Sequence, residues 1–286
     1  MNKILFTLLL LPFLTFSQNS YNMGLIGTYE WNSTEGNDIW GWVSPISEDE
    51  YALVGLNDGF ACVNVSSPSN PTLEFQIADI NSTWRDVKTW GNYAYVTTEA
   101  DAGLLIVDLT DMTGNTNWHV SNFTNPTTGA SVEFTAAHNL YIDENGIAYI
   151  FGAGGSGWQS DGAIFLDVAS NPTNPVYLGE WDDQYIHDGM VRGDTMWVGC
   201  IYTGKLYVVD VSNNLYVECC RATINYRNLA LAQNEDPTYQ DSITVLNDNA
   251  DGDTWDTNYA TNPFEGDQSA MINTDFNAGA NNDWLI

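Results

Sequence analysis

Short apolar segments rich in β-branched and aromatic residues recur along the chain, each bounded by Gly, Asn, Asp or Pro. Residues 51–56, 93–98, 147–152 and 195–200 form one set, whose starts are 42, 54 and 48 residues apart. A second set follows them at residues 60–65, 104–109, 163–168 and 206–211. The composition and turn residues predict β-strands, and the absence of a sustained 3.6-residue period predicts almost no helix. We therefore expect an all-β fold.

Repeating units of this length, with three or four strands each, have the size of β-propeller blades. A single blade cannot bury both faces and needs neighbours, which explains why the unit repeats. The sequence predicts about four successive antiparallel sheets between residues 38 and 211, in a β-propeller-like array that looks incomplete. The segment 23–31 resembles the outer strand at 175–181, so we expect it to close the last blade as an N-terminal outer strand.

One short polar residue closes each strand of the second set. These residues are Asn64, Asp108, Asp167 and Asp210. Each stands just before a polar turn, where a short acceptor can hold the backbone N–H groups of that turn. We expect them to occupy one repeated structural position.

The net charge of the chain limits the kinds of molecule that it can bind. The 286 residues include 7 basic and 37 acidic side chains, a net charge of −30. Such a field repels phosphate backbones and anionic lipid, so the sequence argues against nucleic acid and against direct membrane binding. Residues 1–17 combine Lys3 with an apolar run and a small-residue exit, which predicts a signal peptide and hence a secreted or cell-surface protein.

The four cysteines do not predict a disulfide framework in a chain of this length. Cys62 and Cys200 stand inside apolar strands and are interpreted as small core residues. Cys219 and Cys220 are adjacent, and a bridge from one of them to Cys200 is an alternative that the sequence leaves open.

The phrases GLLIVDL, GAIFLDV and KLYVVDV resemble the LVIVD repeat. Together with WRDVKTWGNYAYV and AHNLYIDENGIAYIFG, they make residues 23–214 similar to the secreted choice-of-anchor B family. This resemblance implies a β-propeller-like repeat domain, here bounded at residues 18–214, that is exported to the cell surface. It implies no reaction.

The pattern breaks after residue 214, and residues 215–247 are expected to form an irregular linker. Residues 248–286 resemble the opening of a choice-of-anchor J, or cleaved-adhesin, jelly-roll domain, with most of its strands still to come. A truncated or misassembled reading frame is one explanation. Asp248, Asp251 and Asp253 alternate on a tight turn, an oxygen set suited to Ca²⁺, although an acidic turn without metal explains them equally well.

Three polar dipeptides precede the predicted inner strands of successive blades. They are Arg85–Asp86, His138–Asn139 and His187–Asp188. One rotation per blade carries each onto the next, so we expect all six residues at one end of the array. They can bind a divalent cation or another ligand, or simply hydrogen-bond neighbouring blades. His119 falls in an outer strand and is expected to lack such partners.

These features favour a non-catalytic secreted or surface protein for binding or adhesion, with an extracellular polymer, glycan or protein as ligand. The alternative is a secreted hydrolase or lyase acting on polysaccharide through the polar ring of dipeptides. No complete catalytic set is visible in the sequence. No cofactor is required by either interpretation, with Ca²⁺ or another divalent cation as an option.

Overall fold

The fold consists of consecutive four-stranded antiparallel sheets, each built from one stretch of chain. A computed structural model describes residues 24–155, 160–212, 218–224 and 243–244. The described part contains strands and turns but no helix, and thus none long and apolar enough to span a membrane. The predicted all-β class is confirmed.

Four sheets form the blades of the array, and each follows the chain from its inner to its outer strand. Blade 1 contains β1 (Gly36–Val43), β2 (Glu50–Leu56), β3 (Gly59–Asn64) and β4 (Thr72–Ala78). Blade 2 contains β5 (Val87–Trp90), β6 (Tyr93–Val96), β7 (Leu104–Asp108) and β8 (Asn117–Val120). Blade 3 contains β11 (Asn139–Ile142), β12 (Ile147–Phe151), β13 (Ala163–Asp167) and β14 (Val176–Trp181). Blade 4 contains β15 (Asp188–Arg192), β16 (Thr195–Cys200), β17 (Lys205–Asp210) and β18 (Glu218–Ile224), beside which lies the short β19 (Ile243–Thr244).

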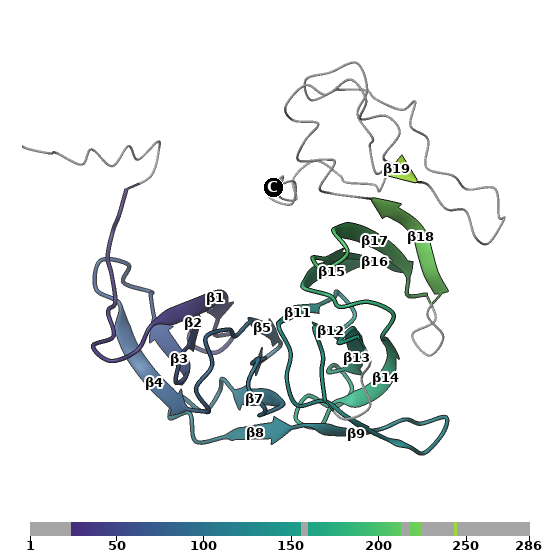
Figure 1. Cartoon of the computed structure of the whole chain (residues 1–286). Helices are drawn as coiled ribbons and strands as arrows, with labels where there is room; N and C mark the ends of the chain where they lie inside the picture. The colour runs from purple at the N-terminus through teal and green to yellow at the C-terminus, as the bar shows by residue number, and fades with distance from the viewer. Residues whose placement is uncertain (1–23, 156–159, 213–217, 225–242, 245–286) are drawn as a thin grey trace, which may run out of the picture.

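The blades stand side by side in an open arc (Figure 1). The inner strands β1, β5, β11 and β15 contact one another in succession, and β4, β8, β14 and β18 lie at the periphery. This arrangement is β-propeller-like, as the repeat predicts.

The hydrophobic core lies between neighbouring blades. Phe60 and Phe75 of blade 1 share a buried cluster with Leu105 and Val107 of blade 2. A second cluster joins blades 2 and 3, and a third joins blades 3 and 4. Burial of apolar surface between blades is worth roughly 25 cal/mol per Å², so each blade is stabilised chiefly by its neighbours.

The four polar residues that close the third strands occupy one repeated position. Asp108, Asp167 and Asp210 pair with the first residues of β6, β12 and β16, and Asn64 pairs with Tyr51, the second residue of β2. Each accepts a backbone N–H of the following turn, from Ser66, Thr110, Ser170 and Ser212 respectively, at 2.8–3.0 Å. The predicted turn-capping role is confirmed.

Replacing Asp108 with Ala should lower the free energy of unfolding by about 1 kcal/mol, the net worth of a hydrogen bond of this kind. Asp108 Oδ1 accepts both the N–H and the hydroxyl of Thr110, at 2.8 and 2.7 Å. Urea unfolding with an unchanged m-value measures the loss. Asp108→Asn is the control, because it keeps an acceptor oxygen at this position. If Ala and Asn variants were equally destabilised, the charge rather than the cap would be responsible.

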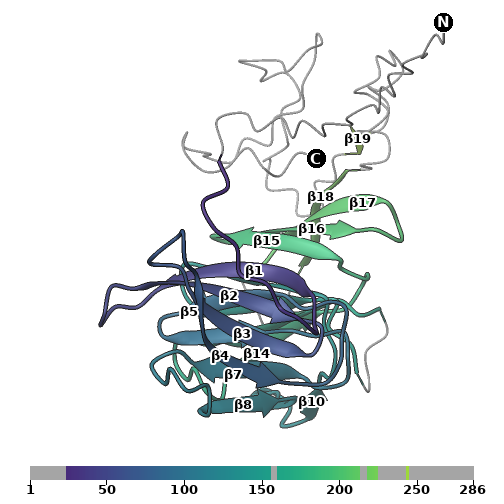
Figure 2. The ribbon, with the colours of Figure 1, turned by 90° about the vertical axis from the view of Figure 1, so that its left-hand side faces the viewer.

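The N-terminal segment does not close the last blade, contrary to the expectation for residues 23–31. Its described part, from Gly24, forms no strand and lies along blade 1. Trp31 packs on Val54, Leu56 and Ala61 of blade 1. The segment before β1 runs over the face of blade 1 that points away from blade 2 (Figure 2). The reason is physical: this face has no neighbouring blade among the described residues, and Trp31 buries part of its apolar surface.

Two other elements differ from the expectation. A hairpin of β9 (Asn122–Thr124) and β10 (Ser131–Glu133) stands between blades 2 and 3 and accounts for the longest repeat interval. β18 pairs with β17 and supplies the outer strand of blade 4. The blade array therefore extends beyond residue 214, into the range expected to be an irregular linker.

Cys62 and Cys200 are buried free thiols, as expected for core residues. Burial raises the pKa of each thiol to about 12, with Glu74 adding to the effect at Cys62. Cys200 is thus a free thiol, against the bridge that the sequence left open, and the side chains of Cys219 and Cys220 lie outside the described part of the chain. Residues 248–286, including Asp248, Asp251 and Asp253, lie outside the described residues.

Candidate functional site

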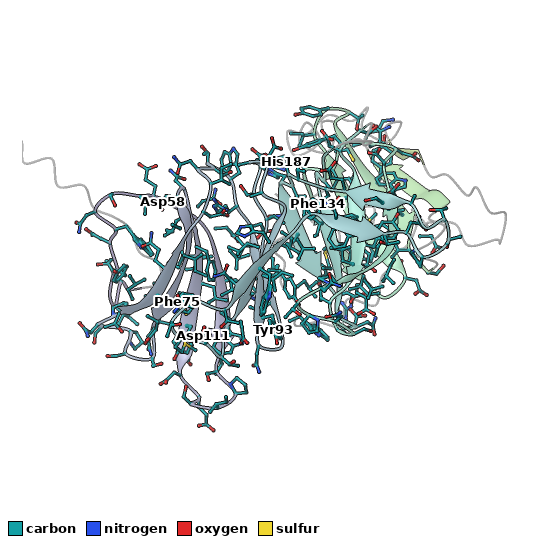
Figure 3. All side chains as sticks on the ribbon, turned by 90° about the horizontal axis from the view of Figure 1, so that it is seen from below. Asp58, Phe75, Tyr93, Asp111, Phe134 and His187 are labelled. Carbon is teal, nitrogen blue, oxygen red and sulfur yellow. The ribbon has the colours of Figure 1, made fainter. Side chains whose placement is uncertain are left out.

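The three predicted dipeptides occupy equivalent positions at the start of β5, β11 and β15. The residues that follow them, Val87, Leu140 and Gly189, pair with Val96, Ile150 and Val198 at matching registers of the next strands. All six dipeptide residues therefore lie at the same end of the array. Figure 3 shows His187 and Asp58 at this end, and Asp111 and Tyr93 at the opposite one.

Blade 1 contributes a fourth dipeptide, Asn37–Asp38, which the sequence analysis missed. It precedes Ile39, whose partner is Val54, at the register of the other three. Asn37 Oδ1 accepts the N–H of Arg85 at 2.9 Å. β1 has 8 residues and β5 has 4. The β1–β2 hairpin is therefore longer than its equivalents, and Asn37–Asp38 lies farther from the second strand of its blade than the other dipeptides do. The similarity of Asn-Asp-Ile to Arg-Asp-Val is the signal that could have found it.

The second residue of the dipeptide links its blade to the next one. Asp38 Oδ2 accepts the N–H of Val87 at 2.9 Å, and Asp86 Oδ2 accepts the N–H of Leu140 at 2.8 Å. Asp86 Oδ1 also lies 2.5 Å from Lys88 Nζ. Burial raises the pKa of Asp86 to about 7, with the Asp38 carboxyl adding to the rise and Lys88 opposing it. These carboxylates thus hold inner strands together.

Arg85 reaches back to blade 1 and is buried there, with 3% of its surface exposed. Its Nε donates to the carbonyl of Leu56 at 2.8 Å, its Nη1 to Asp79 Oδ2 at 2.8 Å, and its Nη2 to the carbonyl of Ile80. All three partners lie at the end of blade 1. Arg85 is therefore a clamp between blades rather than a group that faces a ligand.

His119 has a partner, contrary to expectation. Its Nε2 lies 3.2 Å from Asp79 Oδ1, so this outer-strand histidine shares the carboxylate that binds Arg85. Burial raises the pKa of Asp79, but hydrogen bonds from His119, the N–H of Ile80 and Arg85 outweigh it and lower the pKa to about 2. The sequence did not reveal this pairing because it joins outer strands of two blades.

His138 and His187 meet at the exposed side of the same end. Their ring centroids lie 4.0 Å apart, and His138 Nδ1 lies 2.6 Å from Glu99 Oε1. Burial lowers the pKa of His187, and the neighbouring His138 lowers it further, against the opposing effect of Asp188 and Glu99. The lowered pKa favours the neutral His187 ring, which packs beside a His138 ring that contacts Glu99.

Five aromatic rings from blades 2 to 4 are in contact at this end, and we call them the aromatic row. In order they are Trp84, His138, His187, Tyr185 and Tyr202. The successive centroid distances are 6.2, 4.0, 6.4 and 4.6 Å. Trp84 is 51% exposed and Tyr202 75% exposed, so both ends of the row face solvent.

The sequence analysis missed the three non-histidine members of the row. Trp84 directly precedes Arg85 and Tyr185 precedes His187 by two residues, which is a signal that an aromatic side chain accompanies the dipeptide. Tyr202 lies in the turn between β16 and β17 and becomes a neighbour only through folding. Exposed aromatic side chains gathered from separate loops are typical of interaction sites.

The remaining two dipeptide residues are Asp188 and Asn139. Asp188 Oδ1 accepts the N–H of Gly189 at 2.7 Å, and Asn139, at the start of β11, is half-buried.

Within residues 24–155 and 160–212, no three side chains of His, Cys, Asp and Glu are placed to hold a metal ion. The structure thus divides the predicted ring into a buried set that joins blades, Arg85 and Asp86, and a half-buried pair, His138 and His187.

Comparison with known sequences identifies LVIVD repeats at residues 45–79 and 83–133, which span β2 to β4 and β5 to β10. A search among curated proteins found no match.

Several solved structures align with part of this chain. One is the periplasmic gluconolactonase PpgL of Pseudomonas aeruginosa, at 11% identity and a TM-score of 0.47, covering 67% of this chain and 54% of that one. Another is PorZ, a surface component of the type-IX secretion system of Porphyromonas gingivalis, at 16% identity and a TM-score of 0.46, covering 68% and 29%. The hydrazine synthase of Kuenenia stuttgartiensis matches at 12% identity and a TM-score of 0.42, covering 68% and 53%. The chain spans about half or less of the length of each.

Proposed function

We propose that this LVIVD-repeat protein is a non-catalytic binding or adhesion protein of the cell exterior, with a choice-of-anchor B type of repeat domain. The observation that carries the proposal is the aromatic row, whose exposed ends are Trp84 and Tyr202. Exposed aromatic side chains supply large contact areas at low conformational cost. The ligand is an extracellular polymer, and the blades are the rigid scaffold that holds the rings in place.

The location outside the cell rests on the residues at the N-terminus. Residues 1–17 resemble an export signal, with Lys3 before an apolar run. The net charge of −30 suits a protein that stays soluble in salt and away from nucleic acid. The resemblance of residues 248–286 to an adhesin domain supports the same assignment.

Binding through the row is tested with immobilised extracellular polymers, both polysaccharides and matrix proteins, incubated with the full chain. We expect at least one polymer to retain the wild type and to lose it when Trp84 and Tyr202 are both replaced by Ala. Ile46→Ala is the matched control, since Ile46 is 80% exposed and belongs to the β1–β2 turn at the opposite end. Equal retention of the wild type and the double variant on every polymer would contradict a binding role for the row.

A second candidate function is a hydrolase or lyase acting on polysaccharide, favoured by the 2.6 Å contact between Glu99 and His138. A carboxylate that orients a histidine is an arrangement used in general acid–base catalysis. Sustained release of new sugar ends from any bound polymer, lost in His138→Ala, would establish this function and replace the binding-only one. Binding without product release keeps the first candidate.

A further inference from the structure

The aromatic row is preorganised as a surface rather than as a set of independent side chains. Glu99 fixes the His138 ring, and the His187 ring packs on it at 4.0 Å. Tyr185 lies between His187 and Tyr202, in ring contact with both. Rings held by one another lose little conformational freedom when a ligand packs on them, which lowers the cost of binding.

The surroundings of the row are acidic. Glu99 is 41% exposed in its side chain and touches His138, and Asp161 is an exposed residue whose carbonyl accepts the N–H of Ile186, next to Tyr185. Burial raises the pKa of Tyr185 to about 12, and the negative charges of Tyr202, Glu99 and Asp161 add to the rise. An anionic ligand would be repelled here, by these groups and by the net charge of −30.

A ligand for this surface must offer flat apolar faces in succession and hydrogen-bond donors at its edges. Linked sugar rings meet both needs, because their C–H faces pack on aromatic rings and their hydroxyls donate to carboxylates. An extended peptide is less suited, since its side chains point alternately to opposite sides. Cationic side chains could engage single rings of the row, and a cationic peptide is therefore the competing ligand in the test.

We infer, on the basis of the proposed function, that the aromatic row binds one chain of an uncharged polysaccharide laid across blades 2, 3 and 4. Successive sugar faces pack on Trp84, on the histidine pair and on the Tyr185–Tyr202 pair. Glu99 and Asp161 accept hydrogen bonds from the sugar hydroxyls. Glu99 Oε1 already binds His138, so the second carboxylate oxygen of Glu99 is the one offered to the ligand.

The inference is tested by isothermal titration calorimetry of the full chain with soluble probes of three kinds. The uncharged probes are oligosaccharides of cellulose, xylan and mannan, the anionic probe is oligogalacturonate, and the cationic probe is an oligolysine peptide. We expect an uncharged oligosaccharide to bind with an affinity that barely changes with salt. Trp84→Ala and Tyr202→Ala should each weaken it about tenfold, or about 1.4 kcal/mol. Tyr202→Phe should retain affinity because it keeps the ring, and Ile46→Ala should bind like the wild type.

The outcomes separate the inference from the function on which it rests. If only oligolysine or oligogalacturonate bound, and the row variants abolished that binding, the ligand class would be wrong while the binding role of the row stood. Oligolysine binding through Glu99 would also weaken steeply with salt. If no probe and no immobilised polymer distinguished the wild type from the row variants, both would be overturned. Circular dichroism of each variant shows that lost binding does not come from lost folding.

Discussion

Arg85→Leu should lower the free energy of unfolding by about 3–5 kcal/mol, the range found when one partner of a buried ion pair is removed. The side chains of Arg85 and Asp79 are 0% and 7% exposed, and their charged atoms lie 2.8 Å apart. The substitution leaves the Asp79 carboxylate and the carbonyls of Leu56 and Ile80 without the guanidinium donors. Denaturant unfolding measures the loss, with Arg85→Lys as the control that keeps charge but not the planar fork of donors.

The decrease of the free energy of unfolding at low pH is a second measure of the Arg85–Asp79 ion pair. The pKa of Asp79 is lowered to about 2 in the folded protein, against an ordinary value of 3.8. The stabilisation is therefore present above about pH 4 and is lost as the pH falls through about 2. In Arg85→Leu this pH-dependent loss should be smaller, because the folded pKa moves back toward the unfolded value. An Arg85→Leu protein with wild-type stability and an unchanged decrease at low pH would show that the clamp is dispensable.

Gly162→Ala should destabilise the protein by about 3 kcal/mol, the upper part of the range for forcing an extra methyl group into a packed site. An added Cβ at this position would lie 2.0 Å from the carbonyl oxygen of Trp181, which is backbone and cannot rotate away. Ala163, the next residue, pairs with Trp181 in the β13–β14 ladder. Relief of the clash would therefore separate the outer strand of blade 3 from its neighbour.

Gly41→Ala is the matched control, because an added Cβ at Gly41 meets nothing within 4 Å. It should leave the stability unchanged or slightly raise it, since Ala restricts the unfolded chain more than Gly does. Gly59 starts the third strand of blade 1, and its Cβ would lie 1.9 Å from the carbonyl of Ile77. Gly59→Ala should be at least as destabilising as Gly162→Ala, because the φ of Gly59 is also +153°, a backbone conformation that Ala rarely adopts. A neutral result for both would contradict close strand approach as the reason for a glycine at the start of these two third strands.

The sequence predicted the strands well because their signals are local. Short runs of β-branched and aromatic residues, the turn residues that bound them and the repeat interval located the second and third strands of every blade, and the capping role of Asp108 followed from its place before a turn. The predicted equivalence of the dipeptides rested on the same spacing. Where the spacing changed, the prediction failed, as at Asn37–Asp38, which a longer hairpin separates from the next strand.

The candidate site could be predicted only in part. The residue types at Arg85 and His138 were identified, but their roles depend on what each side chain contacts in the preceding blade. Arg85 meets Asp79 and turns inward, whereas His138 meets Glu99 at the surface. The partners are 6 and 39 residues away in sequence and belong to loops with no periodic signal.

The sequence by itself determined the all-β class, the repeated blade, the polar residue that ends each third strand and the polar pair that starts the inner strands of blades 2, 3 and 4. These features depend on strand propensity, turn residues and hydrogen bonds within a few residues of one another, so they can be read along the chain. The tertiary structure decided that Trp31 covers blade 1, that Arg85 clamps two blades and that Trp84 and Tyr202 end one aromatic row. Each of these depends on the packing of one blade against another, which brings together loops whose separation in sequence carries no information about their distance in space.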